Sequence, residues 1–233
     1  YYTWRGQTDG YWNANNWQSY KPSAANGAIF SGIRHTINTN DFENFETPYL
    51  HFANTAGPFI LRGNPVKLTA SGVDTYADSA ISSISQSPQI VALDVTSEQA
   101  VLGVSALSRF DASVLCLRGA VSVPNGSFAP SGDIVIDGTV NAKDLQLRNT
   151  TIYNSTYGLY PQYRSTTLTI RKTGTVNIAD QTTVNATTSA LWIAKGGRVN
   201  VTGDWICNDV TNEYYVGGTF AVSGAIGGDA GQL

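Results

Sequence analysis

Apolar and polar residues alternate in a short pattern that recurs four times in the second half of the chain. Each copy starts with a glycine and one polar residue, followed by an apolar–any–apolar alternation. The copies are Gly138-Thr-Val-Asn-Ala142, Gly174-Thr-Val-Asn-Ile178, Gly197-Arg-Val-Asn-Val201 and Gly218-Thr-Phe-Ala-Val222, and their starts lie 36, 23 and 21 residues apart. The alternation predicts a short strand with one buried face, and the glycine predicts a turn before it. Repetition at roughly 20–25 residues is typical of a solenoid, so the pattern predicts an all-β parallel β-helix.

Short apolar runs between turn residues extend this prediction to most of the chain. We expect strands at 28–30, 50–52, 59–62, 66–69, 89–93, 114–117, 133–136, 139–141, 145–147, 151–153, 168–170, 176–178, 191–194, 199–201, 205–207 and 220–222. An insertion at 154–166 is rich in tyrosine and is expected to project as a loop. Apolar residues three apart between 97 and 111 also fit a short helix, although Gly103 and β-branched neighbours oppose one.

The first 20 residues are unusually aromatic, with three of the five tryptophans. Asp9-Gly10 is a strong turn signal between two aromatic runs, which predicts a hairpin. We therefore divide the chain into an aromatic cap or hairpin at 1–27 and a parallel β-helix at 28–233. No linker between domains is evident.

Composition narrows the possible functions. Charged residues make up 13% of the chain and the net charge is −3, whereas a nucleic-acid-binding domain normally has a strongly basic surface. The sequence has no methionine, from which we expect that a signal peptide has been removed. Residues 223–233 continue in the style of the repeats, so we expect a longer array that has been cut.

The opening residues carry a family resemblance. The segment Trp4-x-Gly6-x-x-x-Gly10-x-Trp12-Asn13-x-x-Asn16-Trp17 resembles the start of bacterial autotransporter passenger domains and of autotransporter-associated β-strand repeat surface proteins. The stretches 50–69 and 81–90 resemble successive rungs of that family, although Ser83 stands where its asparagine is usual. The resemblance spans about residues 4–125. It implies an exported, right-handed parallel β-helix used in adhesion, in self-association or as a stalk, and without catalytic residues.

The N-terminal aromatic residues are the first candidate site. Trp4, Trp12 and Trp17, with Tyr11 beside them, could form a stacking platform for sugar rings, because aromatic faces suit the apolar CH surfaces of sugars. Alternatively, they could shield the open end of the first coil. We prefer the cap, since the family that the chain resembles places these residues at that end.

Three asparagines form the second candidate site. Asn141, Asn177 and Asn200 take equivalent places in three of the four repeats, each between two apolar positions. They should therefore point outward, one above another, at the ~4.8 Å spacing of neighbouring strands. Such a ladder can form hydrogen bonds along the stack or with the ladder of another molecule, and repeated weak contacts add up through multivalency. A merely solvated polar face is the simpler interpretation.

Other residues give weaker signals. Asp133 and Asp137 are too far apart on a strand to form a catalytic or metal-binding pair, and Asp137-Gly138 is better interpreted as a turn. Arg171-Lys172 is expected in a solvated turn, and the acidic residues 41, 43 and 46 in a solvated loop. His35 and His51 are expected to be structural, and Cys116 and Cys207 could pair or stay free. We expect no metal and no cofactor.

Three functional hypotheses follow. The first is an exported protein of the bacterial cell surface that is not an enzyme and acts in adhesion or self-association. Its partner would be a glycan or protein on a host or neighbouring cell, or a second copy of itself, but not nucleic acid or the membrane interior. The second is a structural subunit of an extracellular filament or surface layer. The third is a polysaccharide-acting β-helix enzyme, which would need acidic and basic side chains clustered on one face.

Overall fold

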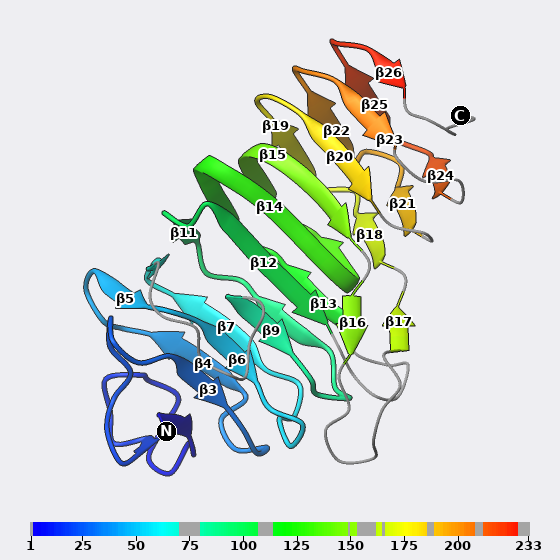
Figure 1. Ribbon diagram of the computed structural model, residues 1–233. Coiled ribbons are helices and arrows are strands. Elements are labelled where there is room, and N and C mark those ends of the chain that lie inside the picture. The colour runs from blue at the N-terminus through cyan, green and yellow to red at the C-terminus, as the bar shows by residue number, and fades with distance from the viewer. Residues whose placement is uncertain are drawn as a thin grey trace.

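The computed structural model describes residues 2–69, 80–106, 114–148, 150–152, 162–164, 166–185, 189–207 and 212–227. It confirms the predicted all-β parallel β-helix, which winds through about 8 turns with an aromatic cluster near the N-terminus. The strands stack from the N-terminal end to the C-terminal end as one elongated body (Figure 1). The described residues contain no helix. Segment 101–106, for which a helix was the alternative, is a strand, and 107–113 lie outside the described residues.

Three parallel sheets run along the solenoid, and each complete coil contributes a strand to each sheet. Sheet 1 contains β1 (Thr3–Trp4), β3 (Ala28–Phe30), β6 (Leu50–Phe52), β9 (Ile81–Ser83), β12 (Val101–Ala106), β20 (Thr182–Asn185), β23 (Trp205–Cys207) and β26 (Ile226–Gly227). Sheet 2 contains β5 (Phe45–Thr47), β8 (Val66–Leu68), β11 (Val95–Ser97), β19 (Thr175–Ile178), β22 (Arg198–Val201) and β25 (Thr219–Val222). Sheet 3 contains β4 (Ile37–Asn40), β7 (Ile60–Gly63), β10 (Gln89–Val91), β13 (Val114–Leu117), β18 (Thr166–Ile170), β21 (Ser189–Ile193) and β24 (Asn212–Val216).

Two long strands turn the corners between sheets without a break. Strand β14 (Ala120–Ile136) pairs with β11 in sheet 2, with β12 in sheet 1 and with β13 in sheet 3. Strand β15 (Thr139–Arg148) pairs with β19 in sheet 2 and with β20 in sheet 1. Strand β16 (Thr150–Ile152), just before the predicted insertion, pairs in antiparallel fashion with β17 (Gln162–Arg164), which lies within it. The tyrosine-rich segment between them lies outside the described residues.

The four copies of the repeated pattern form neighbouring strands of sheet 2, with equivalent residues in register. Val140, Val176, Val199 and Phe220 stand one above another, and the three valines are fully buried. Matching inward rows from sheets 1 and 3 complete one continuous apolar core along the axis. The alternation of buried and exposed residues therefore fixes the direction of each side chain in these strands.

The glycines that open the repeats are required by close packing between coils. None of Gly138, Gly174, Gly197 and Gly218 has a positive φ. A Cβ added at Gly138 would lie 2.3 Å from the carbonyl oxygens of both Arg118 and Gly119 in the preceding coil. A Cβ added at any of the other three glycines would lie 2.3–2.7 Å from a backbone carbonyl oxygen. The chain turns each of these corners so close to the coil beneath that no side chain fits.

Substitution of Gly138 by alanine tests this explanation. We expect Gly138→Ala to lower the free energy of unfolding by about 2 kcal/mol, because rigid backbone carbonyls must shift to admit a methyl group. Gly217→Ala is the matched control at the same kind of corner, since its nearest neighbour would be at 3.4 Å, an ordinary contact. Urea unfolding measures both variants, and equal losses would contradict the packing explanation.

The described part of the core contains a fully buried threonine whose hydroxyl has no hydrogen-bond partner. Thr182 points inward between Leu145 and Trp205 in sheet 1 and is fully buried. Within the described part of the chain its Oγ1 atom has no hydrogen-bond partner. Because an unsatisfied buried polar group costs about 1–3 kcal/mol, we expect the isosteric change Thr182→Val to raise the free energy of unfolding by about 1 kcal/mol. A urea midpoint at or below that of the natural chain would contradict this expectation, and Thr183→Val, on the outward side of the same strand, is the control.

Candidate functional site

The N-terminal tryptophans form a structural cap. Trp4, Trp12 and Trp17 are 1%, 0% and 7% exposed. Trp12 and Trp17 pack edge to face with ring centroids 5.9 Å apart, and both contact Phe30 of the first complete coil. Strands β1 and β2 (Trp17–Gln18) pair in antiparallel fashion, as the predicted hairpin requires. The rings leave no face open for a sugar, so the proposed glycan-stacking platform at these three residues is not formed and the cap interpretation holds.

The three asparagines are stacked and joined by hydrogen bonds into a ladder, which was the alternative to a merely solvated polar face. Asn141, Asn177 and Asn200 are in register on the outer face of sheet 2. The Nδ2 atom of Asn177 donates to Oδ1 of Asn141 at 2.9 Å, and Nδ2 of Asn200 donates to Oδ1 of Asn177 at 2.8 Å. Each hydrogen bond uses one of the two amide hydrogens of the donor asparagine and one of the two lone pairs on the oxygen of the acceptor. Each asparagine therefore keeps at least one donor and one acceptor for a ligand.

The same outward row begins with charged residues. Lys67 lies above Glu46 in the register and bonds to it at 3.3 Å, while Glu98 binds the same ammonium at 3.1 Å. Hydrogen bonds to Glu98 and then to Glu46 raise the pKa of Lys67. All three side chains are exposed, so this group contributes little to stability. Glu46 therefore lies in strand β5 at the N-terminal end of sheet 2, not in the expected solvated loop. Asp41 and Glu43 do lie in the loop before it, where Asp41 accepts a hydrogen bond from the backbone N–H of Asn13.

Asp137 and Cys116, two further residues singled out in the sequence, are structural. Asp137 accepts hydrogen bonds from Thr173 Oγ1 at 2.5 Å and from Arg118 Nε at 3.3 Å, and the Thr173 bond is the main cause of its lowered pKa. It lies at a corner, as the turn interpretation predicts, and the exposed Arg171 and Lys172 occupy the same corner one coil later. Cys116 is a buried free thiol, so it forms no disulfide with Cys207, and burial raises its pKa.

His51 is buried although it points outward from sheet 1. It lies between the inward residues Leu50 and Phe52 in β6, yet it is only 6% exposed. Its Nδ1 atom is 2.8 Å from Ser82 Oγ, in the next coil. Burial lowers the pKa of His51 to about 4. His35, in contrast, is exposed.

The structure also reveals an aromatic pair that the sequence reasoning missed. Trp192 in β21 and Tyr215 in β24 are partners in the register on the outer face of sheet 3. Their rings are stacked, with centroids 3.8 Å apart and planes at 19°, and each residue is 44% exposed. The signal was present: Trp192 lies between two buried residues, Leu191 and Ile193, which is the same pattern that predicts the outward asparagines.

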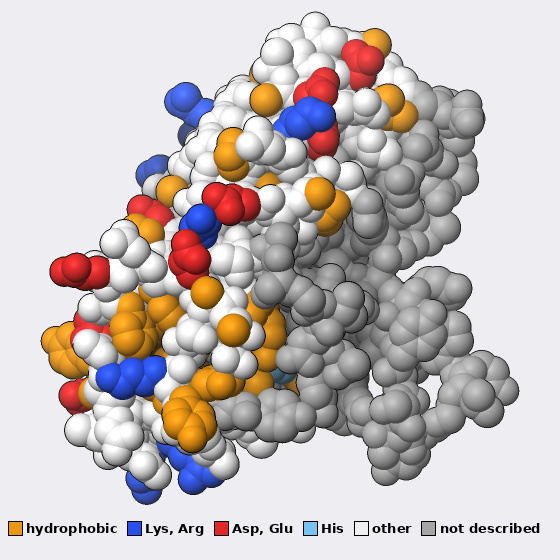
Figure 2. Space-filling view, turned by 60° about the vertical axis from the view of Figure 1, so that its left-hand side comes forward, with side chains coloured by type: hydrophobic (Ala, Val, Ile, Leu, Met, Phe, Trp, Pro, Cys, Tyr) orange, Lys and Arg blue, Asp and Glu red, His pale blue; other side chains and the backbone are white. Residues whose placement is uncertain are grey.

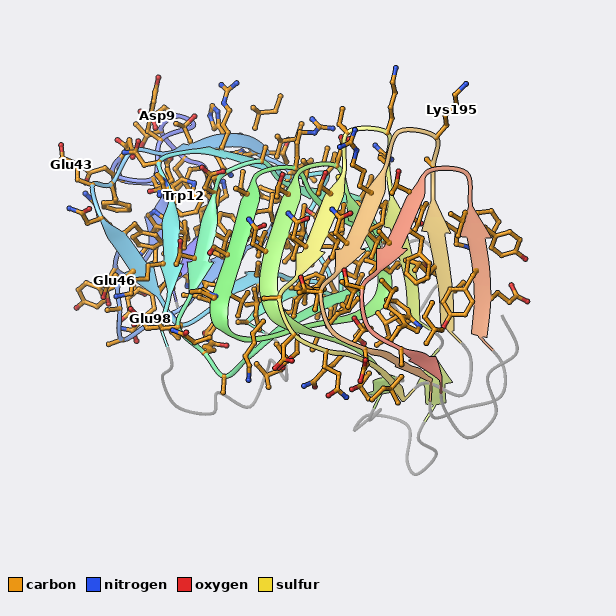
Figure 3. The ribbon with its side chains drawn as sticks, turned by 90° about the horizontal axis from the view of Figure 1, so that it is seen from above. Asp9, Trp12, Glu43, Glu46, Glu98 and Lys195 are labelled. Atoms are coloured by element: carbon orange, nitrogen blue, oxygen red, sulfur yellow. The ribbon has the colours of Figure 1, made fainter. Side chains whose placement is uncertain are left out.

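Charged side chains occur at both ends of the solenoid. Glu43, Glu46 and Glu98 lie toward the N-terminal end and Lys195 toward the other, whereas Trp12 lies within the body (Figure 3). On the face in Figure 2, charged side chains stand singly or in mixed groups among uncharged ones.

Among the described residues, no group of three or more His, Cys, Asp and Glu side chains is placed to hold a metal ion. No helix long and apolar enough to cross a membrane occurs there.

Comparisons with known proteins identify no relative. No protein-family model, curated protein or solved structure matches the chain. The family resemblance of the opening residues therefore stays a prediction.

Proposed function

We propose that this chain is an exported surface protein that acts by adhesion or self-association through the outer faces of its solenoid. The observation that carries the proposal is the asparagine ladder of Asn141, Asn177 and Asn200. It is flanked on the same strands by an outward row of Thr139, Thr175, Arg198 and Thr219. Together these rows make a repeating polar face, which suits a repeating partner, because identical weak contacts recur at every coil.

The enzyme alternative has less support. A polysaccharide-cleaving site needs acidic and basic groups that converge. In the described part of the chain, the one close arginine–carboxylate pair, Arg118 and Asp137, is bound up in a corner with Thr173. We therefore rank this alternative last.

Sedimentation across a range of concentrations, with coated beads as a second assay, tests the proposed function. We expect the natural chain to associate in a concentration-dependent way. The triple change of Asn141, Asn177 and Asn200 to threonine should weaken this association about tenfold or more, because all three repeated contacts are lost at once. Threonine suits a strand but cannot form the amide ladder. The matched control changes three exposed asparagines away from the ladder, Asn15, Asn54 and Asn125, to threonine. Equal association of both triple variants would refute the role of the ladder.

A further inference from the structure

We infer that the exposed aromatic pair of sheet 3 and the basic corner beside it form a binding site for an acidic saccharide. The inference rests on the proposed adhesive function and names the class of ligand. The site contains Trp192 and Tyr215, the threonines of β18, and a group of basic residues that we call the basic corner: Arg171, Lys172, Lys195 and Arg198.

The outward row of sheet 3 explains why an aromatic face is accessible. This row runs through Val135, Thr169, Trp192 and Tyr215 in successive coils. One face of the indole is covered by Tyr215. The other face is directed toward the coil of Thr169, whose side chain is much shorter than the indole. The outer part of the indole therefore extends beyond Thr169 as a ledge, consistent with its 44% exposure.

The ledge has the dimensions and polarity that a sugar ring needs. Neighbouring coils are about 4.8 Å apart, which is the distance at which the apolar face of a pyranose packs on an aromatic ring. At the level of the ligand lie Thr167 and Thr169, both outward and partly exposed on β18. Their hydroxyls can donate to and accept from sugar hydroxyls.

The basic corner gives the site its charge preference. Between residues 166 and 200 the chain has four basic residues and one acidic residue, Asp180, whereas the whole chain has a net charge of −3. Asp180 pairs with Lys143 at 3.8 Å. In the described part of the chain, ion pairs involve none of the four basic side chains of the corner. Lys172, Lys195 and Arg198 are thus available for an anionic ligand. Arg171 also interacts electrostatically with Asp137 in the preceding coil, whose carboxylate already binds Arg118 and Thr173.

The register places this charge beside the ledge. Arg171 follows Thr169 by two residues, and Thr169 is the partner of Trp192. Strand geometry puts the Cα atoms of Arg171 and Trp192 about 8 Å apart, so a guanidinium can reach a carboxylate on the stacked sugar. Lys172 and Lys195 lie on successive corners, where the Lys172 stem runs beside Gly196. Lys195 projects freely from the body of the solenoid (Figure 3).

The other side of the aromatic pair sets the orientation of the ligand. The Tyr215 hydroxyl donates to Glu213 Oε2 at 3.1 Å. This carboxylate would repel an anion, so the acidic group of the sugar points toward Arg171. A single-stranded nucleic acid would also use stacking and positive charge, but it needs a longer basic track than one corner of an acidic chain supplies.

Calorimetric titration with tetragalacturonate tests the inference, with the fully methyl-esterified tetrasaccharide as the neutral comparison. We expect the natural chain to bind the acid form more tightly, by a margin that shrinks as salt is added. Trp192→Thr should weaken binding of both forms about tenfold. Arg171→Gln should weaken only the acid form, to a similar extent. Arg62→Gln is the matched control, because Arg62 is an exposed arginine at the other end of sheet 3.

Three results would overturn the site: no heat of binding, equal affinity of the Trp192→Thr variant, or tighter binding of an oligothymidylate than of the tetrasaccharide. Failure of the proposed function is distinguishable from failure of this site. The asparagine-to-threonine triple variant should keep its affinity for the tetrasaccharide, and Trp192→Thr should keep the self-association measured by sedimentation. Unchanged urea midpoints establish that both variants are folded.

Discussion

Replacement of Trp12 by alanine is expected to lower the free energy of unfolding by about 4 kcal/mol, the usual cost of deleting a buried aromatic side chain. Trp12 is fully buried and packs against Trp17, Phe30 and Phe45, with centroids 5.4–5.9 Å apart. Its indole Nε1 donates to Oδ1 of the buried Asn38 at 2.8 Å. The change therefore opens a cavity and also leaves a buried amide oxygen without its donor.

Two further variants separate these contributions. Trp12→Phe keeps most of the ring contacts but removes the N–H group, so it should cost about 2 kcal/mol. Tyr11→Ala is the neighbouring control, since Tyr11 is 53% exposed, and should change stability by less than about 0.5 kcal/mol. Urea unfolding followed by tryptophan fluorescence and circular dichroism measures all three. If Trp12→Ala unfolds at the same urea concentration as Tyr11→Ala, the aromatic cluster does not act as a cap.

Much of the fold can be predicted because apolar residues alternate in the repeats. Val140, Val176 and Val199 predict both the strands and the inward direction, and the asparagines beside them are then necessarily outward. The same rule, applied to the buried Leu191 and Ile193 on either side of it, would also have placed Trp192 outward. What it could not supply was the stacking on Tyr215, because the register between β21 and β24 depends on the length of the turn between them.

The rule fails where polar residues occupy the core. Strand β4 was missed because its inward residues are Asn38 and Asn40, which are 0% and 1% exposed. Asn38 accepts from Trp12, and Asn40 Nδ2 donates to the carbonyl of Asn64 at 2.9 Å. These partners satisfy groups that would otherwise oppose burial. A pattern of apolar residues cannot reveal a strand whose core positions depend on hydrogen bonds to other coils.

The repeat glycines show a related limit. A glycine before a strand suggests a turn with a positive φ, but Gly138 instead meets two carbonyl oxygens of the preceding coil. That requirement depends on the distance between coils, which no local pattern encodes. Burial of outward residues is equally non-local: Cys116 and Val135 point outward from sheet 3 and are 5% and 9% exposed. The sequence predicts the direction of a side chain far better than its surroundings.

His51 is the clearest consequence of such burial, and we expect it to make the stability of the protein depend on pH. Its pKa is about 4 in the folded chain, against about 6.5 in an unfolded chain. The unfolded state therefore binds more protons between these two values, so the free energy of unfolding falls as the pH falls. The stabilisation is complete above pH 6.5 and is lost progressively down to about pH 4. The total loss is about 3 kcal/mol, with a slope of about 1.4 kcal/mol per pH unit.

Urea unfolding of the natural chain and of His51→Asn, at pH 7, 6, 5 and 4, measures this contribution. An asparagine amide lies where the Nδ1 atom of histidine does, so it can keep the bond to Ser82 Oγ without titrating. Carboxylates titrate equally in both proteins, so the difference between the two curves isolates His51. The difference should shrink by about 3 kcal/mol from pH 7 to pH 4. His35→Asn, at an exposed histidine, is the matched control for the same substitution. Parallel curves for the natural chain and His51→Asn would mean that the imidazole is not held neutral by burial.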